Sequence, residues 1–386
     1  MIARRSLLLT ALLAAPAAWA KLPATLDIRA IERRRLLPQS AALLAAAPRT
    51  IATIPALRSP AGPQDYYSEG DYWWPDPANP GGPYVRRDGR SNPDKFDGHR
   101  DALIAFGRTV PALAALWDLT GEARFADAAM RHLGAWFVDP KTRMNPNLNH
   151  AQAIIGVNSG RAIGVIDTLQ IVEVARAAAL FARKDAPGYA AIRAGVESWF
   201  AEYLAWLTTS PFGATERQEQ NNHGTCWLLQ AASFAALLGR ADILDDASRR
   251  LQTVIVPTQI EPDGRQPLEL ARTKPYAYSL FNLDVLAASA WLLGGSELIG
   301  WKTPDGRSIG GAIAWMAPFI ADKTKWPLPP DIEYWDGFPV RQPSLLFGSL
   351  AQKRSDWLNL WERLDPDPVI SEVVRNFPVR QPVLWL

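Results

Sequence analysis

Residues 219–239 read EQNNHGTCWLLQAASFAALLG, a polar start followed by a nearly continuous apolar run. The apolar residues begin at Trp227 and cover most positions of the next turns. A pattern this broad predicts a helix that begins at its polar end and is buried in a core. A helix of this kind needs similar helices around it, because an isolated apolar surface is not stable in water.

Helical patterns of the same kind recur on both sides of this stretch. We expect one helical region at 27–47, and then helices at 99–118, 122–137, 159–184, 188–208, 219–239, 241–254, 276–294, 306–323 and 343–362. Turn signals mark the breaks at Asp139-Pro140, at 210–213, at 262–264 and at 294–296. Strands do not alternate with these segments. The chain is therefore predicted to be all-α, with pairs of helices packed in layers, and an α/α toroid (an incomplete helical barrel) fits its length.

Residues 48–98 do not follow the helical pattern. They are rich in Pro, Gly, Asp and Asn and carry clustered aromatic residues at Tyr66-Tyr67 and at 72–74. A loop this long inside a compact domain is usually functional or disordered, and its aromatic content argues against disorder. We therefore expect a long, aromatic-rich N-terminal loop with a role in function.

The first 20 residues have the features of a bacterial signal peptide. Arg4 and Arg5 precede an apolar run, which ends in the Ala18-Trp19-Ala20 cleavage pattern. We expect residues 1–20 to be removed and residues 21–386 to form a single domain, exported to the periplasm or secreted. The chain has 1 Cys, so no internal disulfide is available there.

Charge and composition exclude several classes of protein. The 41 basic residues, less Arg4 and Arg5, equal the 39 acidic residues, so the mature chain has no net charge to draw in nucleic acid. The sequence has no P-loop and no GxGxxG, and no later apolar run is long enough for a membrane anchor. The 4 His residues show no metal-ligand spacing. We expect a monomer with no nucleic-acid or membrane partner, no cofactor and no metal.

The densest polar cluster lies at the start of the predicted helix at 219–239. Asn221, Asn222 and His223 place side-chain donors beside the free N–H groups and the positive end of a helix. Such a helix end suits an anion. Helix capping by the asparagines together with a structural histidine is an equally open explanation.

A second cluster, ELARTKPYAYSLFN, occupies residues 269–282. Arg272 is a permanent cation with a geometry that matches a carboxylate, and Tyr278 follows six residues later. A nearby Arg and a protonated His lower the pKa of a phenol. The alternative for this cluster is an Arg272–Glu269 salt bridge and a core tyrosine.

Together, Asn222, His223, Arg272 and Tyr278 suit β-elimination on a uronate. The first three would neutralise the substrate carboxylate, so that the C5 proton becomes acidic. Tyr278 would remove that proton and protonate the departing O4. In 4-linked β-D-mannuronate and β-D-glucuronate the two atoms lie on one ring face, so one group can serve both steps.

These motifs resemble the alginate lyase superfamily. The resemblance rests on NNHGT (221–225), ELART (269–273), DYWWP (71–75), NHAQA (149–153) and GRAIGVID (160–167), and it covers about residues 60–345. His223 and Arg272 are 49 residues apart, and with the six-residue spacing to Tyr278 this is closer to polysaccharide lyase family 38 than to family 5. The resemblance implies an α/α-toroid lyase acting on glucuronan, polymannuronate or alginate. It assigns the carboxylate to Asn222, His223 and Arg272 and the acid/base role to Tyr278, with Tyr276 as the alternative.

The remaining site predictions concern substrate binding. Arg161 is expected to hold a second carboxylate unless it pairs with Asp167. The aromatic residues at 72–74 would form a sugar platform or a lid, or would plug the base of the toroid. The full predicted set is Tyr72, Trp73, Trp74, His150, Gln152, Arg161, Asn221 and Tyr276.

Two rival functions remain open at the level of sequence. A glycoside hydrolase acting on uronate oligosaccharides would use two carboxylates, drawn from Glu216, Glu219, Glu261, Asp263 and Glu269. A non-catalytic periplasmic polysaccharide-binding protein would need the aromatic residues without the Arg272/Tyr278 pair. Cys226 lies one helical turn after His223, but we expect it to be a small buried residue.

Overall fold

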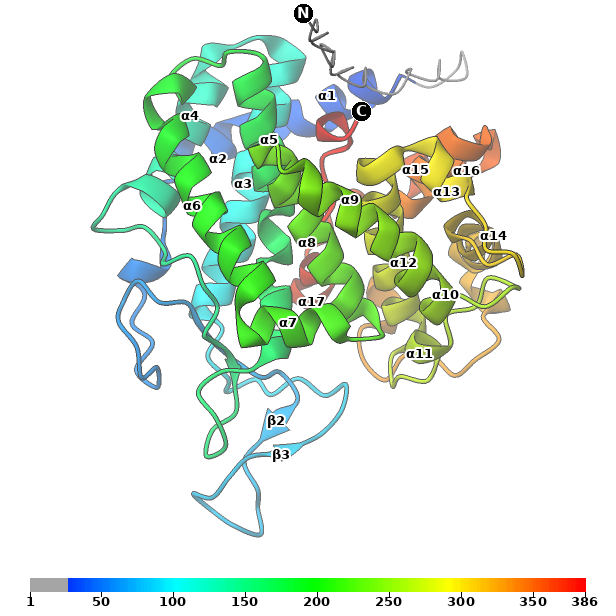
Figure 1. Ribbon diagram of the computed structural model, residues 1–386, viewed down its shortest axis with the longest axis horizontal. Helices are drawn as coiled ribbons and strands as arrows, with labels where there is room; N and C mark the ends of the chain where they lie inside the picture. The colour runs from blue at the N-terminus through cyan, green and yellow to red at the C-terminus, as the bar shows by residue number, and fades with distance from the viewer. Residues whose placement is uncertain (1–26) are drawn as a thin grey trace, which may run out of the picture.

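A computed structural model describes residues 27–386 of the protein. The predicted signal peptide, residues 1–20, lies outside the described residues, so export remains a prediction. The described chain is an α/α toroid, as the sequence predicts (Figure 1).

The inner layer of the toroid consists of helices that are buried on nearly every side. They follow one another around the ring, each packed on the next: α3 (Gly98–Thr120), α5 (Val172–Arg183), α8 (Asn222–Leu238), α12 (Pro275–Gly294) and α15 (Pro343–Gln352). Gly107 permits one close contact in this layer, because a Cβ there would lie 2.1 Å from the carbonyl oxygen of Gln170. By length and composition α3 and α12 could cross a bilayer, but 67% and 72% of their apolar windows are buried inside the protein, as in core helices.

The outer layer consists of helices that each pack on an inner helix next to them. It contains α4 (Ala123–Leu133), α6 (Tyr189–Thr209), α9 (Ala241–Arg250), α13 (Ser296–Gly300), α14 (Ile309–Ala321) and α16 (Ser355–Arg363). Figure 1 shows α6 beside α5, and α9 beside α8.

The two ends of the described chain complete the ring. Helices α1 (Ile28–Leu36) and α2 (Ser40–Ala45) pack on α3, and α17 (Ser371–Arg375) leads into a C-terminal segment at 376–386. This segment lies against inner helices: Glu173 of α5 accepts hydrogen bonds from the backbone N–H groups of Arg380 and Gln381. Trp291 of α12 donates to the carbonyl of Trp385. The C-terminal segment therefore packs against α5 and α12 of the inner layer (Figure 1).

The aromatic-rich loop lies across one end of the toroid. Strand β1 (Tyr67–Glu69) pairs in parallel with β4 (His150–Ala153), and β2 (Trp73–Trp74) pairs antiparallel with β3 (Val85–Arg86). Figure 1 shows β2 and β3 projecting beyond the helical body at that end.

Three predicted segments differ from the structure. The predicted helix at 343–362 is two helices, because Lys353 adopts a left-handed conformation (φ 55°) that ends α15. Residues 211–218 form helix α7 (Pro211–Gln218) instead of a loop, since Pro211 suits the first helical position and the Ser210 side chain caps the N–H of Gly213. Residues 162–171 form a 3₁₀ helix ahead of α5. The short helices α10 (Val256–Gln259) and α11 (Pro267–Leu270) lie between α9 and α12.

Candidate active site

The inner helices α8 and α12 begin beside each other at the end of the toroid that carries the aromatic loop. A cavity of about 330 Å³ lies there. Its lining residues are Asp71, Tyr72, Trp73, Arg86, Gln152, Arg161, Ile163, Ile166, Glu219, Asn221, Asn222, His223, Arg272, Tyr278, Phe281, Arg375 and Asn376. The N-terminal ends of two helices and four arginines make this cavity suited to an anion. An open groove of about 710 Å³ adjoins it and shares Glu219 and Asn221 with it.

The start of α8 presents Asn221, Asn222 and His223 to the cavity. Asn221 caps the helix, because its side-chain oxygen accepts the N–H of His223 at 3.0 Å. Asn222 donates its backbone N–H and its side-chain amide to the carboxylate of Glu269, both at 2.8 Å. Glu269 therefore holds Asn222, and it forms no ion pair with Arg272. The salt bridge considered as an alternative for Arg272 is wrong.

His223 is held by a buried carboxylate. Its Nδ1 lies 2.7 Å from Oε1 of Glu216, a residue of α7 with 0% exposure. Burial by itself lowers the pKa of His223, but the negative charge and hydrogen bond of Glu216 raise it above its ordinary value. A protonated ring at neutral pH presents Nε2–H as a donor to an anion in the cavity.

The hydroxyl of Tyr278 lies between a cation and a second phenol. Nη2 of Arg272 donates to it at 3.1 Å, and the hydroxyl of Tyr72 lies 2.6 Å away. Burial and the neighbouring Tyr72 phenol raise the pKa of Tyr278 well above its ordinary value, while Arg272 and Lys274 act to lower it. Arg272 would thus stabilise a negative charge on this oxygen, and Tyr72 can donate a hydrogen bond to it when its hydroxyl turns toward the phenolate.

Arg272 has a further partner on the aromatic loop. Asp88 lies 3.4 Å from its Nη2 and accepts a hydrogen bond from Thr273. The loop is therefore tied to the segment that precedes α12, close to the cavity.

A second arginine faces the cavity from the 3₁₀ segment. Arg161 donates from Nε to the carbonyl of Gln152 (2.8 Å) and from Nη2 to the side-chain oxygen of the same residue (3.1 Å), and it lies 5.8 Å from the ring centre of Trp73. Gln152 itself has a left-handed backbone (φ 50°), which is uncommon for a residue other than glycine. The alternative Arg161–Asp167 pair is not formed, because Asp167 pairs with Arg100.

Three of the predicted substrate-binding residues do not line the cavity. Tyr276 is 0% exposed and donates to the carbonyl of Phe319, so its hydroxyl does not face the cavity, and the geometry favours Tyr278 as the acid/base. Two positions on a helix differ by roughly 200° around its axis, which separates Tyr276 from Tyr278. His150 has a buried Nδ1 without a partner and lies outside the lining, and Trp74 donates to the carbonyl of Arg90.

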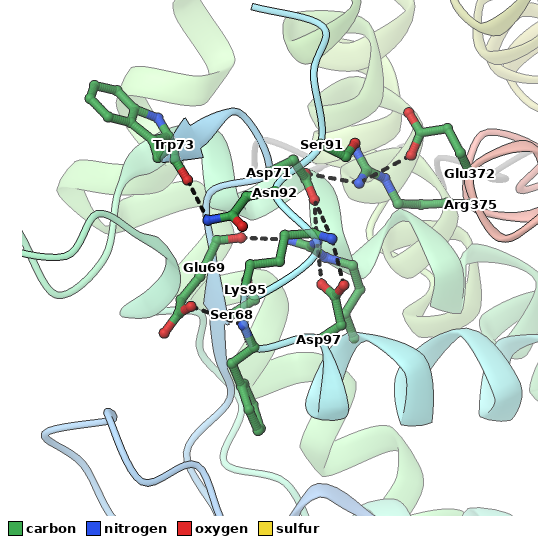
Figure 2. Close-up of polar contacts among 12 residues, drawn as sticks. Ser68, Glu69, Asp71, Trp73, Ser91, Asn92, Lys95, Asp97, Glu372 and Arg375 are labelled. Carbon is green, nitrogen blue, oxygen red and sulfur yellow. Dashed lines mark hydrogen bonds and ion pairs between the residues drawn. The ribbon is translucent and has the colours of Figure 1, made fainter. Parts of the chain in front are cut away.

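Several residues of the site gave no clear signal in the sequence. Figure 2 shows Arg375 between Asp71 and Glu372, with its Nη1 2.8 Å from Asp71 and 3.4 Å from Glu372. Asp71 belongs to the aromatic loop, whereas Arg375 and Glu372 belong to α17. The C-terminal part of the chain therefore contributes to the site, and no local pattern around Arg375 indicates this.

The arrangement does not favour hydrolysis. Among the carboxylates considered for that reaction in the described chain, Glu219 alone lines the cavity; Glu216 and Glu269 are engaged by His223 and Asn222. Cys226 is fully buried, and burial raises its thiol pKa well above the ordinary value, so it is no nucleophile. Within residues 27–386 no group of three or more His, Cys, Asp or Glu side chains is arranged to hold a metal ion.

Comparisons with known proteins agree with the fold described above. A sequence model of the family described as "Alginate lyase" matches residues 52–326. The crystal structure of an alginate lyase from Bacteroides ovatus is similar at 30% identity, with a TM-score of 0.78, over 92% of this chain and 92% of that one. The apo form of a histidine-to-alanine variant of alginate lyase A1-III, an enzyme of Sphingomonas species A1, shares the fold at 18% identity and a TM-score of 0.51, over 83% of this chain and 84% of that one. Among curated proteins none is similar enough in sequence to count as a match.

Proposed function

This chain belongs to the alginate lyase family, and from that premise we propose that it cleaves a 4-linked β-D-polyuronate by β-elimination at the cavity described above. The protein is a polysaccharide lyase acting on a polyuronate. The observation that carries the residue-level proposal is the Tyr278 hydroxyl. It lies between Arg272 and Tyr72, on the wall of a cavity that Asn222 and His223 also line.

The first task of the site is to neutralise the substrate carboxylate. Arg272 supplies a fixed positive charge, and protonated His223 supplies a donor at Nε2 that Glu216 holds in place. Asn222 has one amide N–H left after its bond to Glu269, at the positive end of α8. Donors already in position stabilise the enediolate that develops at C5, because they need no rearrangement during the reaction.

The second task is to move one proton. Tyr278, as the phenolate, removes the proton from C5; the C4–C5 double bond then forms as the C4–O4 bond breaks, and Tyr278 returns the proton to O4. The phenol serves as base and then as acid, so the cycle needs no other proton carrier. During the phenolate stage Tyr72 donates its hydroxyl to Tyr278 and Arg272 donates its N–H.

One acid/base on one side of the sugar favours substrates in which H5 and O4 share a ring face. Polymannuronate and glucuronan meet this condition, whereas polyguluronate needs a second group on the opposite face. Arg161, Gln152 and Trp73 line the same cavity, and we assign them to the sugar beside the cleaved bond, with Arg161 holding its carboxylate.

Absorbance measurements on four polymers test the proposal. The protein would be incubated in parallel with polymannuronate, glucuronan, polyguluronate and hyaluronan, because elimination creates a conjugated double bond that absorbs ultraviolet light. We expect the absorbance to rise with polymannuronate or glucuronan. The Tyr278→Phe variant should give no rise in absorbance but should still bind the substrate. New reducing ends without absorbance would indicate hydrolysis and would overturn the proposal, whereas binding without any new ends would indicate a carbohydrate-binding protein.

We also propose where the enzyme acts and in what oligomeric state. The leader at residues 1–20 supports export to the periplasm or outside the cell, where an anionic polysaccharide is the partner we expect. We further expect a monomer that needs no membrane. Size-exclusion chromatography of the mature chain and fractionation of the producing cells test these two points.

A further inference from the structure

Lys274 is a buried cation beside the tyrosine pair. Its side chain is 3% exposed, and Nζ lies 5.4 Å from the ring centre of Tyr72, 5.8 Å from that of Tyr278 and 5.3 Å from that of Tyr334. Burying an ammonium group costs folding free energy unless an anion pairs with it. The position and the partner of Lys274 therefore indicate what the residue does.

The backbone fixes where Lys274 lies. It is the N-cap of α12, and its carbonyl accepts the N–H of Tyr278 at 3.0 Å. Asp331 accepts the N–H groups of Tyr276 and Ala277, both at 2.9 Å, and so holds the first turn. Lys274 and Tyr278 are four positions apart, which places them on one face of the helix start.

Glu372 of the C-terminal helix α17 is the partner of Lys274. Its Oε1 lies 3.0 Å from Nζ, and its other oxygen faces Arg375, which in turn pairs with Asp71 of the aromatic loop. Figure 2 shows this arrangement from Glu372 to Asp71. Burial lowers the pKa of Lys274, but Glu372 more than offsets this, so the amine stays charged.

Lys274 does not contact the substrate cavity. It lines a second cavity, of about 10 Å³, together with Tyr334 and Glu372, and this cavity shares Tyr278, Phe281 and Asn376 with the substrate cavity. A void of this size holds about one water molecule. Any effect of Lys274 on the reaction therefore passes through the tyrosines or through Glu372 and Arg375.

We propose that Lys274, held by Glu372, is a positioning residue for the elimination: from the side of Tyr278 opposite the substrate it fixes both tyrosine rings and offsets negative charge on the Tyr278 oxygen. This inference rests on the acid/base role of Tyr278 in the proposed function. The C-terminal helix thereby takes part in catalysis without touching substrate.

Several other groups act on Tyr278, and an experiment must hold them fixed. Those on the surrounding elements are Tyr72, Asp88, His223, Glu219, Arg272, Glu333, Tyr334, Glu372 and Arg375. Substitutions at Lys274 and Glu372 remove no side chain that lines the substrate cavity, and Arg375, which loses one partner in Glu372→Gln, keeps its ion pair with Asp71.

The direct test measures the ionisation of residue 278. Tyr278 is replaced by difluorotyrosine, a more acidic phenol whose ¹⁹F resonance reports its charge, and the titration is repeated with Lys274→Met, Lys274→Arg and Glu372→Gln. An opposite charge at this range shifts a pKa by at least about one unit, so we expect the midpoint to rise by about one unit in Lys274→Met. It should stay near the wild-type value in Lys274→Arg and fall in Glu372→Gln, since the anion beside the amine is gone.

Kinetics with the natural tyrosine provide the second readout. In Lys274→Met a smaller fraction of Tyr278 is ionised at neutral pH, but each phenolate is a stronger base, so the two effects partly cancel. We expect kcat to fall about three- to tenfold and KM to change little. Lys274→Arg should restore kcat, because it keeps the positive charge. Lys323→Met is the matched control, because Nζ of Lys323 lies 3.9 Å from the ring centre of Trp335 and 5.3 Å from that of Tyr276 but has no contact with Tyr278.

The outcomes separate this inference from the proposed function. An unchanged midpoint in both Lys274→Met and Glu372→Gln, in folded protein, would overturn the role of Lys274 while wild-type elimination still stands. Equal losses of thermal stability and activity in these two variants, without opposite shifts of the midpoint, would mean that the pair only anchors α17. Shifted midpoints in a protein that shows no elimination on any polymer would instead contradict the proposed function.

Discussion

Oε1 of Glu216 lies 2.7 Å from Nδ1 of His223, so a carboxylate with no exposed surface fixes the ring that faces the cavity. The pair comes from two consecutive helices, α7 and α8, joined by a short turn. It leaves Nε2 as the atom of His223 that can reach an anion.

We first expect Glu216→Gln to weaken catalysis through His223. Glu216 raises the pKa of His223 against the effect of burial, so its removal lowers that pKa and reduces the protonated fraction of the ring at neutral pH. We expect kcat/KM to fall about tenfold, since a donor to the substrate carboxylate is lost. Steady-state kinetics and the histidine resonances in NMR check this, with Glu197→Gln on the surface of α6 as the control. Wild-type kinetics in Glu216→Gln would show that the charge of His223 is not used.

The pH dependence of the wild-type enzyme follows from two shifted groups. Burial raises the pKa of Tyr278, so below that pKa the phenolate fraction grows tenfold with each pH unit and activity rises. His223 must keep its proton, and its pKa is raised, so the rise should flatten only above the ordinary histidine value of about 6.5. In Glu216→Gln the flattening should move to lower pH. A profile of kcat/KM on one polymer checks both statements, and activity that falls between mildly acidic and neutral pH would contradict the assignment.

Tyr72→Phe removes the hydroxyl that lies 2.6 Å from that of Tyr278. The phenolate of Tyr278 would lose one donor, and we expect kcat to fall about tenfold while the fold is kept. Tyr189→Phe is a matched control, because its buried hydroxyl has no partner in the described structure and lies on α6, away from the cavity. Equal kcat values for Tyr72→Phe and wild type would remove Tyr72 from the mechanism.

Arg161→Met tests the second carboxylate site. If Arg161 holds the uronate beside the cleaved bond, its loss should raise KM about tenfold, change kcat little and weaken the effect of salt on binding. Arg87→Met in the aromatic loop serves as a control, since the guanidinium group of Arg87 lies over the ring of Trp74 and does not line the cavity. A drop in kcat with unchanged KM would instead place Arg161 close to the reacting atoms.

Local sequence patterns predicted the helices well where the apolar run was long. The predicted helices at 99–118, 188–208 and 276–294 correspond to α3, α6 and α12 within a few residues. The sequence gives no sign of the division of 343–362, because the break is a single residue, Lys353, whose type does not favour a left-handed backbone. Helix α7 was missed because Pro211 reads equally as a turn and as a first helical residue.

The sequence by itself determined the helical class, the polar start of α8 and the Arg272/Tyr278 cluster, since each depends on residues close together in the chain. The tertiary structure alone decided that Tyr278 and not Tyr276 faces the cavity, that Glu216 holds His223, and that Lys274, Glu372 and Arg375 join the C-terminal helix to the site. These contacts depend on how helices rotate and pack against one another. That information is spread over the whole core, so no local run of residues carries it.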